Sequence, residues 1–422
     1  MVEFRPIEAD QTAKYWAVLQ HAFDIEAGPG ADEDDPGPET DDWPPELFDP
    51  RGLFDDGELV SVCKLYYFDA YLHDGFTTVG GLGAVATPPE HRRQGYVRQL
   101  LSEALAEYRD VGVDVVTLWP FSVPFYRQLG WGIANKYTVY ELPPEQLRFA
   151  RGAAGTVHRL DPDDWGRLRS VEVAFGSGTA LSMRRSKRWW QDRTLSAWSG
   201  RNEPYVYGYE RGGELRGYVL YTVDRAEDGD RTLRVMDLAH VDDDAYLGLL
   251  AFLSDHDSQV ASVRLPRAAE TELLDRVHDP GDVECTVRVG PMARLVDVAA
   301  ALEGYGWPDG VDVGFSLAVD DPLLERNDRG FAVRVSDGSA TVEPAPSGNT
   351  SAAGDTSAAG DTSADVTPDV SLDVGTLSRL YLGSVDVPVA ERVGDCTIRE
   401  PDVREVLTAA FPSQRVCLRE FF

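Results

Sequence analysis

The sequence predicts an α/β protein with mixed (α+β) sheets, organised in three consecutive units. Its 422 residues are 43% hydrophobic and can bury more than one core, because domains usually hold about 100 to 200 residues. Segments with helical periodicity also alternate with strand-like runs along the whole chain. A repeated polar tract near residue 350 interrupts the last unit, which otherwise has the same mixed pattern.

The first predicted unit covers residues 1–147 and contains the clearest elements. After Gly95, apolar residues recur every three to four positions, which predicts a helix with one buried face. The expected elements in chain order are a helix at 11–23, strands at 59–68 and 76–86 that pair antiparallel, a helix from about 96 and a buried strand at 113–118. The local order is therefore strand, basic turn, helix, strand.

Two further units are expected at 148–285 and 286–422. Their strongest patterns are strands at 205–209, 218–223, 311–319 and 330–335 and a helix at 246–253. In the last unit the hexapeptide Thr-Ser-Ala-Ala-Gly-Asp repeats from residue 350, which predicts a disordered insertion at about 345–369. Because strand-like segments flank it, the insertion is expected to lengthen a loop and not to separate domains.

The charge balance limits the possible partners. With 40 basic and 72 acidic residues the formal net charge is −32, which argues against nucleic-acid binding through a basic surface. Lysine occurs at only four positions, so 36 of the 40 basic residues are arginine. This composition resembles that of proteins adapted to a high-salt cytoplasm, where surface carboxylates hold water. Much of the negative charge then serves solvation.

Other common classes of protein lack support. The four cysteines are far apart, without the spacing of a disulfide framework or a zinc site, so no metal is expected. No run of 18 apolar residues and no secretory leader is found, which predicts a cytoplasmic protein without a membrane segment. The stretch Gly81–Ala86 superficially fits a dinucleotide fingerprint, but it lies within an expected strand and is discounted.

The basic turn before the expected helix is the main chemical signal. Arg92, Arg93, Gly95 and Tyr96 lie where a strand gives way to a helix. Exposed N–H groups at a helix start, the positive end of the helix dipole and two arginines all favour a phosphorylated ligand. The alternative interpretation is a charged, solvated helix cap.

Tyr126 is a candidate general acid, because it follows the buried strand at 113–118. A tyrosine has a reference pKa of about 10, so it stays protonated at neutral pH and can give a proton to a thiolate leaving group. The alternative is an ordinary core aromatic residue.

Together these motifs resemble a known family. The turn Thr87-Pro-Pro-Glu-His-Arg-Arg-Gln-Gly95 with Phe125-Tyr-Arg-Gln-Leu-Gly-Trp131 is similar to a GNAT acetyltransferase of the Eis (enhanced intracellular survival) type. The resemblance covers the whole chain. It implies a catalytic GNAT domain at 1–147, a second GNAT-like domain without cofactor at 148–285, and a sterol-carrier-protein-like α+β domain at 286–422.

The resemblance also implies a reaction and its residues. An acetyl group would pass from acetyl-CoA to a primary amine by direct attack, with no acyl-enzyme. Val85 and Thr87 would hold the pantetheine arm through their backbones and polarise the thioester carbonyl. The pyrophosphate would be bound by the turn residues Arg92, Arg93, Gly95 and Tyr96. Tyr126 would be the general acid, and the α-carboxylate of Phe422 would help to deprotonate the amine.

The carboxylate role is unusual, because an α-carboxyl has a reference pKa of about 3.5 and needs a water bridge or apolar surroundings to act as a base. Most chain ends fray, which is the alternative here. The segment 415–422 has alternating apolar residues, which predicts a docked strand.

Two features depart from the family or lie outside its motifs. Val97 stands where the GNAT pattern usually has Gly or Ala, and the polar repeat lengthens the last domain. The acidic loop with Asp24, Glu26 and Trp43 is a lesser candidate for attracting a cationic amine, although it is interpreted mainly as a solvated surface.

The expected function is therefore acetyl-CoA-dependent N-acetylation of a small-molecule or peptide amine, by a homo-oligomer that is a hexamer by resemblance. The alternative is a protein that binds CoA or an apolar ligand without turnover. A third possibility is a tandem-GNAT aminoacyl transferase, but its tRNA partner conflicts with the charge of −32.

Overall fold

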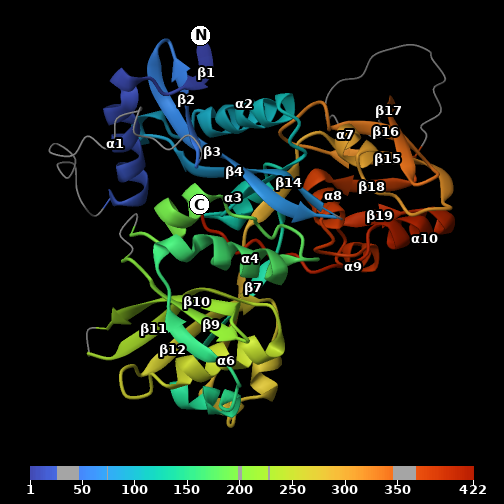
Figure 1. Ribbon diagram of the computed structural model, residues 1–422. Helices are drawn as coiled ribbons and strands as arrows, with labels where there is room; N and C mark the ends of the chain where they lie inside the picture. The colour runs from blue at the N-terminus through green and yellow to red at the C-terminus, as the bar shows by residue number, and fades with distance from the viewer. Residues whose placement is uncertain (26–46, 74, 198–201, 227–228, 346–366) are drawn as a thin grey trace, which may run out of the picture.

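The computed structural model contains three mixed sheets, each with its own helices (Figure 1). The structure describes residues 1–25, 47–73, 75–197, 202–226, 229–345 and 367–422. The polar repeat and the positions Glu26 and Trp43 lie outside these ranges. The predicted mixed α/β fold in three parts is confirmed.

The first sheet has seven strands in the order β1-β2-β3-β4-β5-β14-β6. They are β1 (Val2–Pro6), β2 (Asp49–Asp55), β3 (Glu58–Leu72), β4 (Gly75–Ala86), β5 (Val115–Leu118), β14 (Met292–Leu295) and β6 (Gly132–Ile133). Its helices are α1 (Thr12–Phe23), α2 (Tyr96–Asp110) and α3 (Val123–Arg127). The predicted antiparallel pairing of β3 with β4 is confirmed.

The two long helices of this unit cover opposite faces of the sheet. Leu100 and Leu105 of α2 pack with Leu53, whereas Val18 of α1 packs with the next strand residue, Phe54. Because successive strand residues point to opposite faces, this alternation separates the two helices. The face that carries α1 is left partly open for the chain terminus.

The second sheet also has seven strands, in the order β13-β7-β12-β11-β10-β9-β8. They are β7 (Lys136–Leu142), β8 (Thr156–Arg159), β9 (Tyr205–Arg211), β10 (Glu214–Arg225), β11 (Arg231–His240), β12 (Ser262–Ala268) and β13 (Glu284–Val289). The helices that belong to this part are α4 (Trp165–Gly176), α5 (Lys187–Trp189) and α6 (Asp243–Ser254). The strands and the helix predicted for this part are found.

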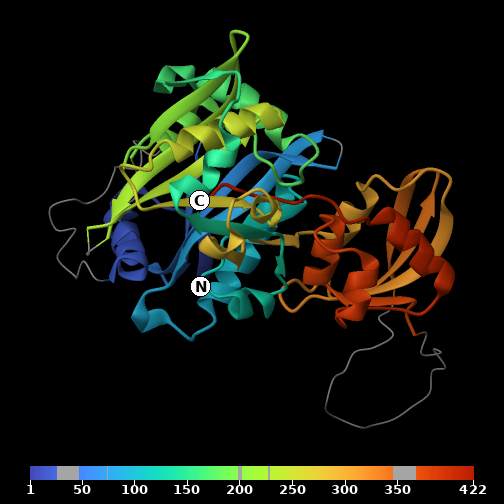
Figure 2. The same ribbon diagram turned by 90° about the horizontal axis from the view of Figure 1, so that it is seen from below.

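The third sheet has five strands in the order β17-β16-β15-β18-β19 and lies to one side of the other two (Figures 1 and 2). Its strands are β15 (Asp312–Asp320), β16 (Arg329–Ser336), β17 (Ser339–Ala345), β18 (Val370–Asp373) and β19 (Cys396–Ile398). The helices are α7 (Val298–Glu303), α8 (Val374–Tyr381), α9 (Val387–Arg392) and α10 (Pro401–Ala410). The polar repeat connects β17 to β18, so strands flank it as expected.

The three parts are interlocked by one short strand. β14 pairs antiparallel with β5 and β6 of the first sheet, although it follows the last strand of the second sheet in the chain. All four residues of β14 are buried, and Arg294 among them forms an ion pair with Asp321 of the third unit. The predicted boundaries at 147 and 285 stay a prediction, because the chain returns to the first sheet after residue 290.

The end of the chain differs from the expectation. Residues 415–422 are docked, but the predicted strand is wrong, since only Val416 forms an isolated bridge, with Ala180. The terminus enters the space between the first sheet and α4, near the centre of the molecule (Figures 1 and 2). Side-chain contacts hold it there in place of a strand ladder.

Candidate active site

The first sheet opens between β4 and β5. The two parallel strands pair only at Gly80–Val116 and Gly81–Thr117. Beyond these pairs β4 has a bulge, where Ala84 has a positive φ of 52° and the register with β3 shifts. A bulge leaves backbone groups out of the ladder and re-aims the strand, so a ligand can meet β4 here. Val85 directly follows the bulge.

The chain terminus lies against this part of β4. A methyl group at Gly83 would come within 3.4 Å of the backbone oxygen of Phe422, and one at Gly81 would come within 2.9 Å of its ring. The Phe422 ring also contacts Tyr66 and Phe68 of β3, with centroids 5.1 and 4.7 Å away. Glycine in β4 therefore makes room for the terminus, and the ring is buried with its aromatic neighbours.

Three hydrogen bonds hold the last residues in line. Trp119, just after β5, donates its indole N–H to the carbonyl of Glu420 at 2.7 Å. Arg193 donates to the carbonyl of Phe421 at 2.9 Å. Further back, the amide of Leu418 donates to the side-chain oxygen of Asn135 at 3.0 Å. The terminus is thus fixed by residues of both the first and the second part of the chain.

A buried ion cluster anchors the Glu420 side chain in the second unit. Arg185 lies 2.6 Å from Glu420, 2.7 Å from Glu172 of α4 and 2.9 Å from Asp237 of β11. Arg419 adds a second cation at 2.5 Å from Asp237. All but Arg419 are buried, so removal of one partner would leave an uncompensated charge in a dry interior. Sequence reasoning missed this cluster, because its partners are up to 248 positions apart.

Tyr126 lies in α3, which follows β5, and its side chain is 3% exposed. Its ring packs edge-on against Phe125 and Trp131. Burial raises the pKa of Tyr126 well above its usual range, so the phenol keeps its proton at neutral pH. A protonated phenol can donate but cannot act as a base there.

The basic turn has the conformation of an open helix start. Gly95 caps α2 with a positive φ of 88°, and no side chain accepts a hydrogen bond from the first turn. Arg93 also has a positive φ, of 61°, while Arg92 donates to the carbonyl of Thr87 at 3.1 Å. Both arginine side chains are exposed, and nothing lies within 4 Å of a methyl group at Gly95. These residues fit a pyrophosphate, because the helix N–H groups and two cations are free to face it.

Two of the predicted residues have side chains that are already engaged. The Thr87 hydroxyl lies 2.9 Å from the hydroxyl of Ser61. The Tyr96 hydroxyl donates to Asp55 of β2 at 2.7 Å, and this hydrogen bond raises the pKa of Tyr96. Thr87 and Tyr96 can therefore contact a ligand through their backbone groups and, for Tyr96, also through the face of its ring. Val85 to Tyr96 form one continuous segment of the chain, whereas Tyr126 and Phe422 come from distant segments.

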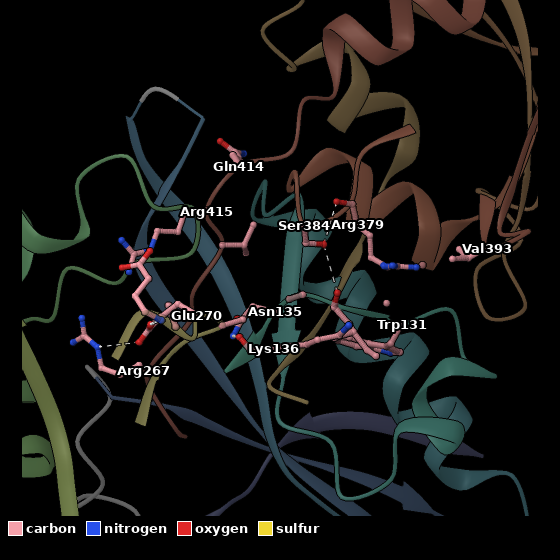
Figure 3. A pocket seen from close by; sticks show the side chains of 18 of the residues that line it. Trp131, Asn135, Lys136, Arg267, Glu270, Arg379, Ser384, Val393, Gln414 and Arg415 are labelled. Carbon is pink, nitrogen blue, oxygen red and sulfur yellow. Dashed lines mark hydrogen bonds and ion pairs between the residues drawn. The ribbon is translucent and has the colours of Figure 1, made fainter. Parts of the chain in front are cut away.

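Two large cavities lie near the tail. One, of about 920 Å³, is lined by all three parts of the chain and is shown in Figure 3. The other, of about 520 Å³, is bordered by Trp119, Phe421 and the strands β11 and β12. It is within the usual size of a small-molecule site.

Other site types find no support in the described residues. No group of three or more His, Cys, Asp or Glu residues among them is placed to hold a metal ion. Within the same residues, no helix combines the length and apolar character needed to cross a membrane. Asp24 of the acidic loop is exposed at the end of α1, and the rest of that prediction lies outside the described residues.

Comparison with known families assigns all three parts. Residues 3–134 match the family described as an acetyltransferase (GNAT) domain, and residues 181–295 match a second family of the same description. Residues 298–419 match the sterol carrier protein domain. The order of domains is the one that the sequence resemblance implied.

Whole-chain relatives agree with this. A Streptomyces avermitilis protein named as an uncharacterized N-acetyltransferase is 25% identical over 367 residues, 79% of this chain and 78% of its own. The GCN5-related N-acetyltransferase from Anabaena variabilis has the same fold over 100% of both chains, with a TM-score of 0.79 and 19% identity. Eis1 from Mycobacterium abscessus superposes over 100% of both chains with a TM-score of 0.73 and 24% identity. The chain therefore carries two GNAT acetyltransferase domains followed by a sterol carrier protein domain, as an acetyl-CoA-dependent acetyltransferase with the fold of Eis1.

Proposed function

We propose that the chain moves an acetyl group from acetyl-CoA to a primary amine by direct attack. Tyr126 acts as the general acid, and the α-carboxylate of Phe422 assists as the base. The observation that carries the proposal is the contact of the chain terminus with Gly83, beside the bulge where β4 and β5 separate. A thioester bound along β4 would then meet an attacking amine beside the terminal carboxylate.

The co-substrate is held by the segment from Val85 to Tyr96. Backbone N–H groups at Val85 and Thr87 bind the pantetheine arm and polarise the thioester carbonyl. The start of α2, with Arg92, Arg93 and Gly95, binds the pyrophosphate. The open conformation at Gly95 and the exposed arginines support this assignment.

Proton transfer is divided between two groups. Phe422 is buried, with its ring packed against the rings of Tyr66 and Phe68, and a poorly solvated carboxylate is a better proton acceptor. As the amine attacks, the carboxylate takes its proton, directly or through one water. The C–S bond breaks, and the Tyr126 phenol protonates the leaving thiolate.

Thiol release from acetyl-CoA tests the proposal, with the native untagged C-terminus in molar KCl. Tyr126→Phe should lower kcat by about 100-fold or more, the usual effect of losing a general acid, with acetyl-CoA affinity unchanged. Phe121→Leu, at an exposed ring in contact with Tyr126, is the matched control and should stay close to wild type. Unchanged kcat in Tyr126→Phe would exclude the acid role.

Extension of the chain tests the base. One alanine added after Phe422 moves the carboxylate out of its aromatic surroundings, so turnover should be lost while acetyl-CoA still binds. An alanine added at the N-terminus is the control. Full turnover of the C-terminally extended chain would contradict the carboxylate role.

The non-catalytic carrier has less support. The cavity inside the third unit has about 20 Å³, far below the roughly 300–1,000 Å³ of a usual small-molecule site. A lipid therefore has no preformed space there among the described residues, and no observation favours the carrier.

We also propose that the protein assembles as a homo-oligomer, a hexamer by resemblance to Eis-type proteins, in a high-salt cytoplasm. The excess of 72 acidic over 40 basic residues supports the salt adaptation. Light scattering of the native chain in molar KCl tests the assembly, and a monomer at all concentrations would contradict it.

A further inference from the structure

The cavity of about 520 Å³ leads away from the chain terminus into the second unit. Its lining includes Trp119 and Phe421, the residue before the chain terminus. It also includes Arg267 and Arg415, which line the larger cavity as well. In Figure 3 these two arginines lie on the same side of the larger cavity, close to Glu270. The two cavities therefore meet at this pair.

The lining of this cavity has the opposite charge to the rest of the chain. Its cationic residues outnumber its carboxylates, whereas the whole chain has 72 acidic and 40 basic residues. The ionisable lining residues are Arg185, Arg193, Arg234, Arg264, Arg267, Arg415 and Arg419 on one side and Asp224, Asp237 and Glu420 on the other. A local excess of guanidinium groups in an acidic protein favours an anionic ligand.

Arg185 and Arg234 have carboxylate partners within 3 Å, whereas the only ion pair of the two arginines at the junction, among the described residues, is a long one. Arg234 has Asp224 at 2.7 Å, and Arg185 lies within the buried cluster. Arg267 has only the distant Glu270, at 3.9 Å, although its side chain is 10% exposed and its buried Nε donates to no acceptor. For Arg415, no carboxylate of the described residues lies within 4.0 Å.

A neighbouring histidine responds to this charge. Arg267 lies 3.5 Å from the Nε2 atom of His240 at the end of β11. Burial, together with Arg267 and Arg415, lowers the pKa of His240 to about 4. His240 is therefore neutral at pH 7 and does not compete for an anion, while it reports the local positive potential.

We propose that the acetyl acceptor is an amine that also carries an anionic group, a carboxylate or a phosphate, which Arg267 and Arg415 bind at the far end of the cavity. The inference rests on the proposed transferase function and names the class of its acceptor. The amine then points past Phe421 toward the terminal carboxylate. A dication such as a polyamine lacks the anionic end and meets the guanidinium groups instead.

Thiol release with matched amines tests this. The acceptors are ω-aminocarboxylates of increasing chain length, each compared with the alkylamine and the diamine of the same carbon number. The aminocarboxylate of the fitting length should exceed its alkylamine in kcat/KM by about tenfold to a hundredfold, the effect of a charge-assisted hydrogen bond. ω-Aminoalkyl phosphonates in the same series separate carboxylate from phosphate preference.

Two variants assign the effect to the junction. Arg267→Gln with Arg415→Gln should remove the preference for the aminocarboxylate, so that its kcat/KM falls to that of the alkylamine measured with the same variant. Arg234→Gln, on the same cavity but paired with Asp224, is the matched control and should retain the preference. Equal or better rates with the diamine, unchanged by the double variant, would overturn the inference while the transferase function stands.

A binding measurement separates this failure from failure of the transferase. The His240 ring is titrated by NMR with the aminocarboxylate and with the alkylamine, without acetyl-CoA. A bound anion offsets the two guanidinium charges, so the aminocarboxylate should raise the His240 pKa and the alkylamine should not. An unshifted His240 overturns the anion site. A shifted His240 with no thiol release from any amine refutes the transferase function and, with it, the acceptor role.

Discussion

Two helices begin at equivalent places in two sheets of this chain, but only one start is open to a phosphate. In the first unit α2 connects β4 to the parallel strand β5, and in the second unit α6 connects β11 to the parallel strand β12. At α2 the cap is Gly95, with no side-chain hydrogen bond and with exposed arginines before it. The N–H groups of the first turn are therefore available to a ligand.

The start of α6 is occupied by the protein itself. Asp242 caps it and accepts from the amide of Ala245 at 2.9 Å. Arg211 and Arg216 both lie 2.8 Å from the same carboxylate, and two more acidic residues follow in the first turn. A phosphate would meet a filled site and like charge there. The helix start is thus open in one unit and closed by its own side chains in the other, and a few residues at that start decide which.

The largest effect is expected from making the open start resemble the closed one. Gly95→Asp places a carboxylate where the pyrophosphate would lie, at a positive φ that costs a non-glycine residue about 1–2 kcal/mol. The Kd for acetyl-CoA, measured by calorimetry, should rise at least about 100-fold, since 1.4 kcal/mol is already tenfold. Gly112→Asp is the control, because Gly112 also has a positive φ with open space around it but lies at the other end of α2. If Gly95→Asp and Gly112→Asp bind acetyl-CoA equally well, the open start of α2 is not the pyrophosphate site.

Removal of the two cations should have a smaller effect. Arg92→Gln with Arg93→Gln should weaken acetyl-CoA binding by about tenfold at low salt and less in molar KCl, where charges are screened. Acetyl-pantetheine, which lacks the pyrophosphate, should bind the variant and the wild type equally. Arg109→Gln, exposed near the other end of α2, serves as the control. A loss that is the same with both thioesters would show that the arginines do not contact the pyrophosphate.

The sequence could predict the open helix start but not the distant segments that pack around it after folding. The helical period after Gly95 and the basic turn are local patterns, so α2 and its arginines were expected from neighbouring residues. The placement of β14 in the first sheet was not expected, because a strand of four residues, three of them apolar, carries no information about which sheet it joins. The Arg185 cluster was missed for the same reason, since it joins residues from α4, β11 and the tail that are adjacent only after folding.

In the second unit the cap should matter for stability alone. Asp242→Ala removes the hydrogen bond to Ala245 and a partner of two arginines, so the free energy of unfolding should fall by about 1 kcal/mol. The affinity for acetyl-CoA should be unchanged. Urea unfolding measures the stability and calorimetry measures the affinity. Asp243→Ala is the control, because Asp243 does not cap the helix. A second equivalent of bound acetyl-CoA in Asp242→Ala would mean that the cap alone closes this unit.

A pH dependence is expected at the end of β11, where His240 packs against Phe175 and Tyr246. Because the folded pKa of His240 is about 4 and a free histidine has about 6.5, the unfolded chain binds more protons between these values. The free energy of unfolding should therefore fall as the pH drops from 6.5 toward 4 and be independent of His240 above 6.5. His240→Gln should show a shallower loss between pH 7.5 and 5 in urea titrations than the wild type, and the exposed His21→Gln should follow the wild type. If His240→Gln loses as much stability as the wild type between pH 7.5 and 5, the His240 ring is open to water. The end of β11, directly before the capped start of α6, would then not be closed.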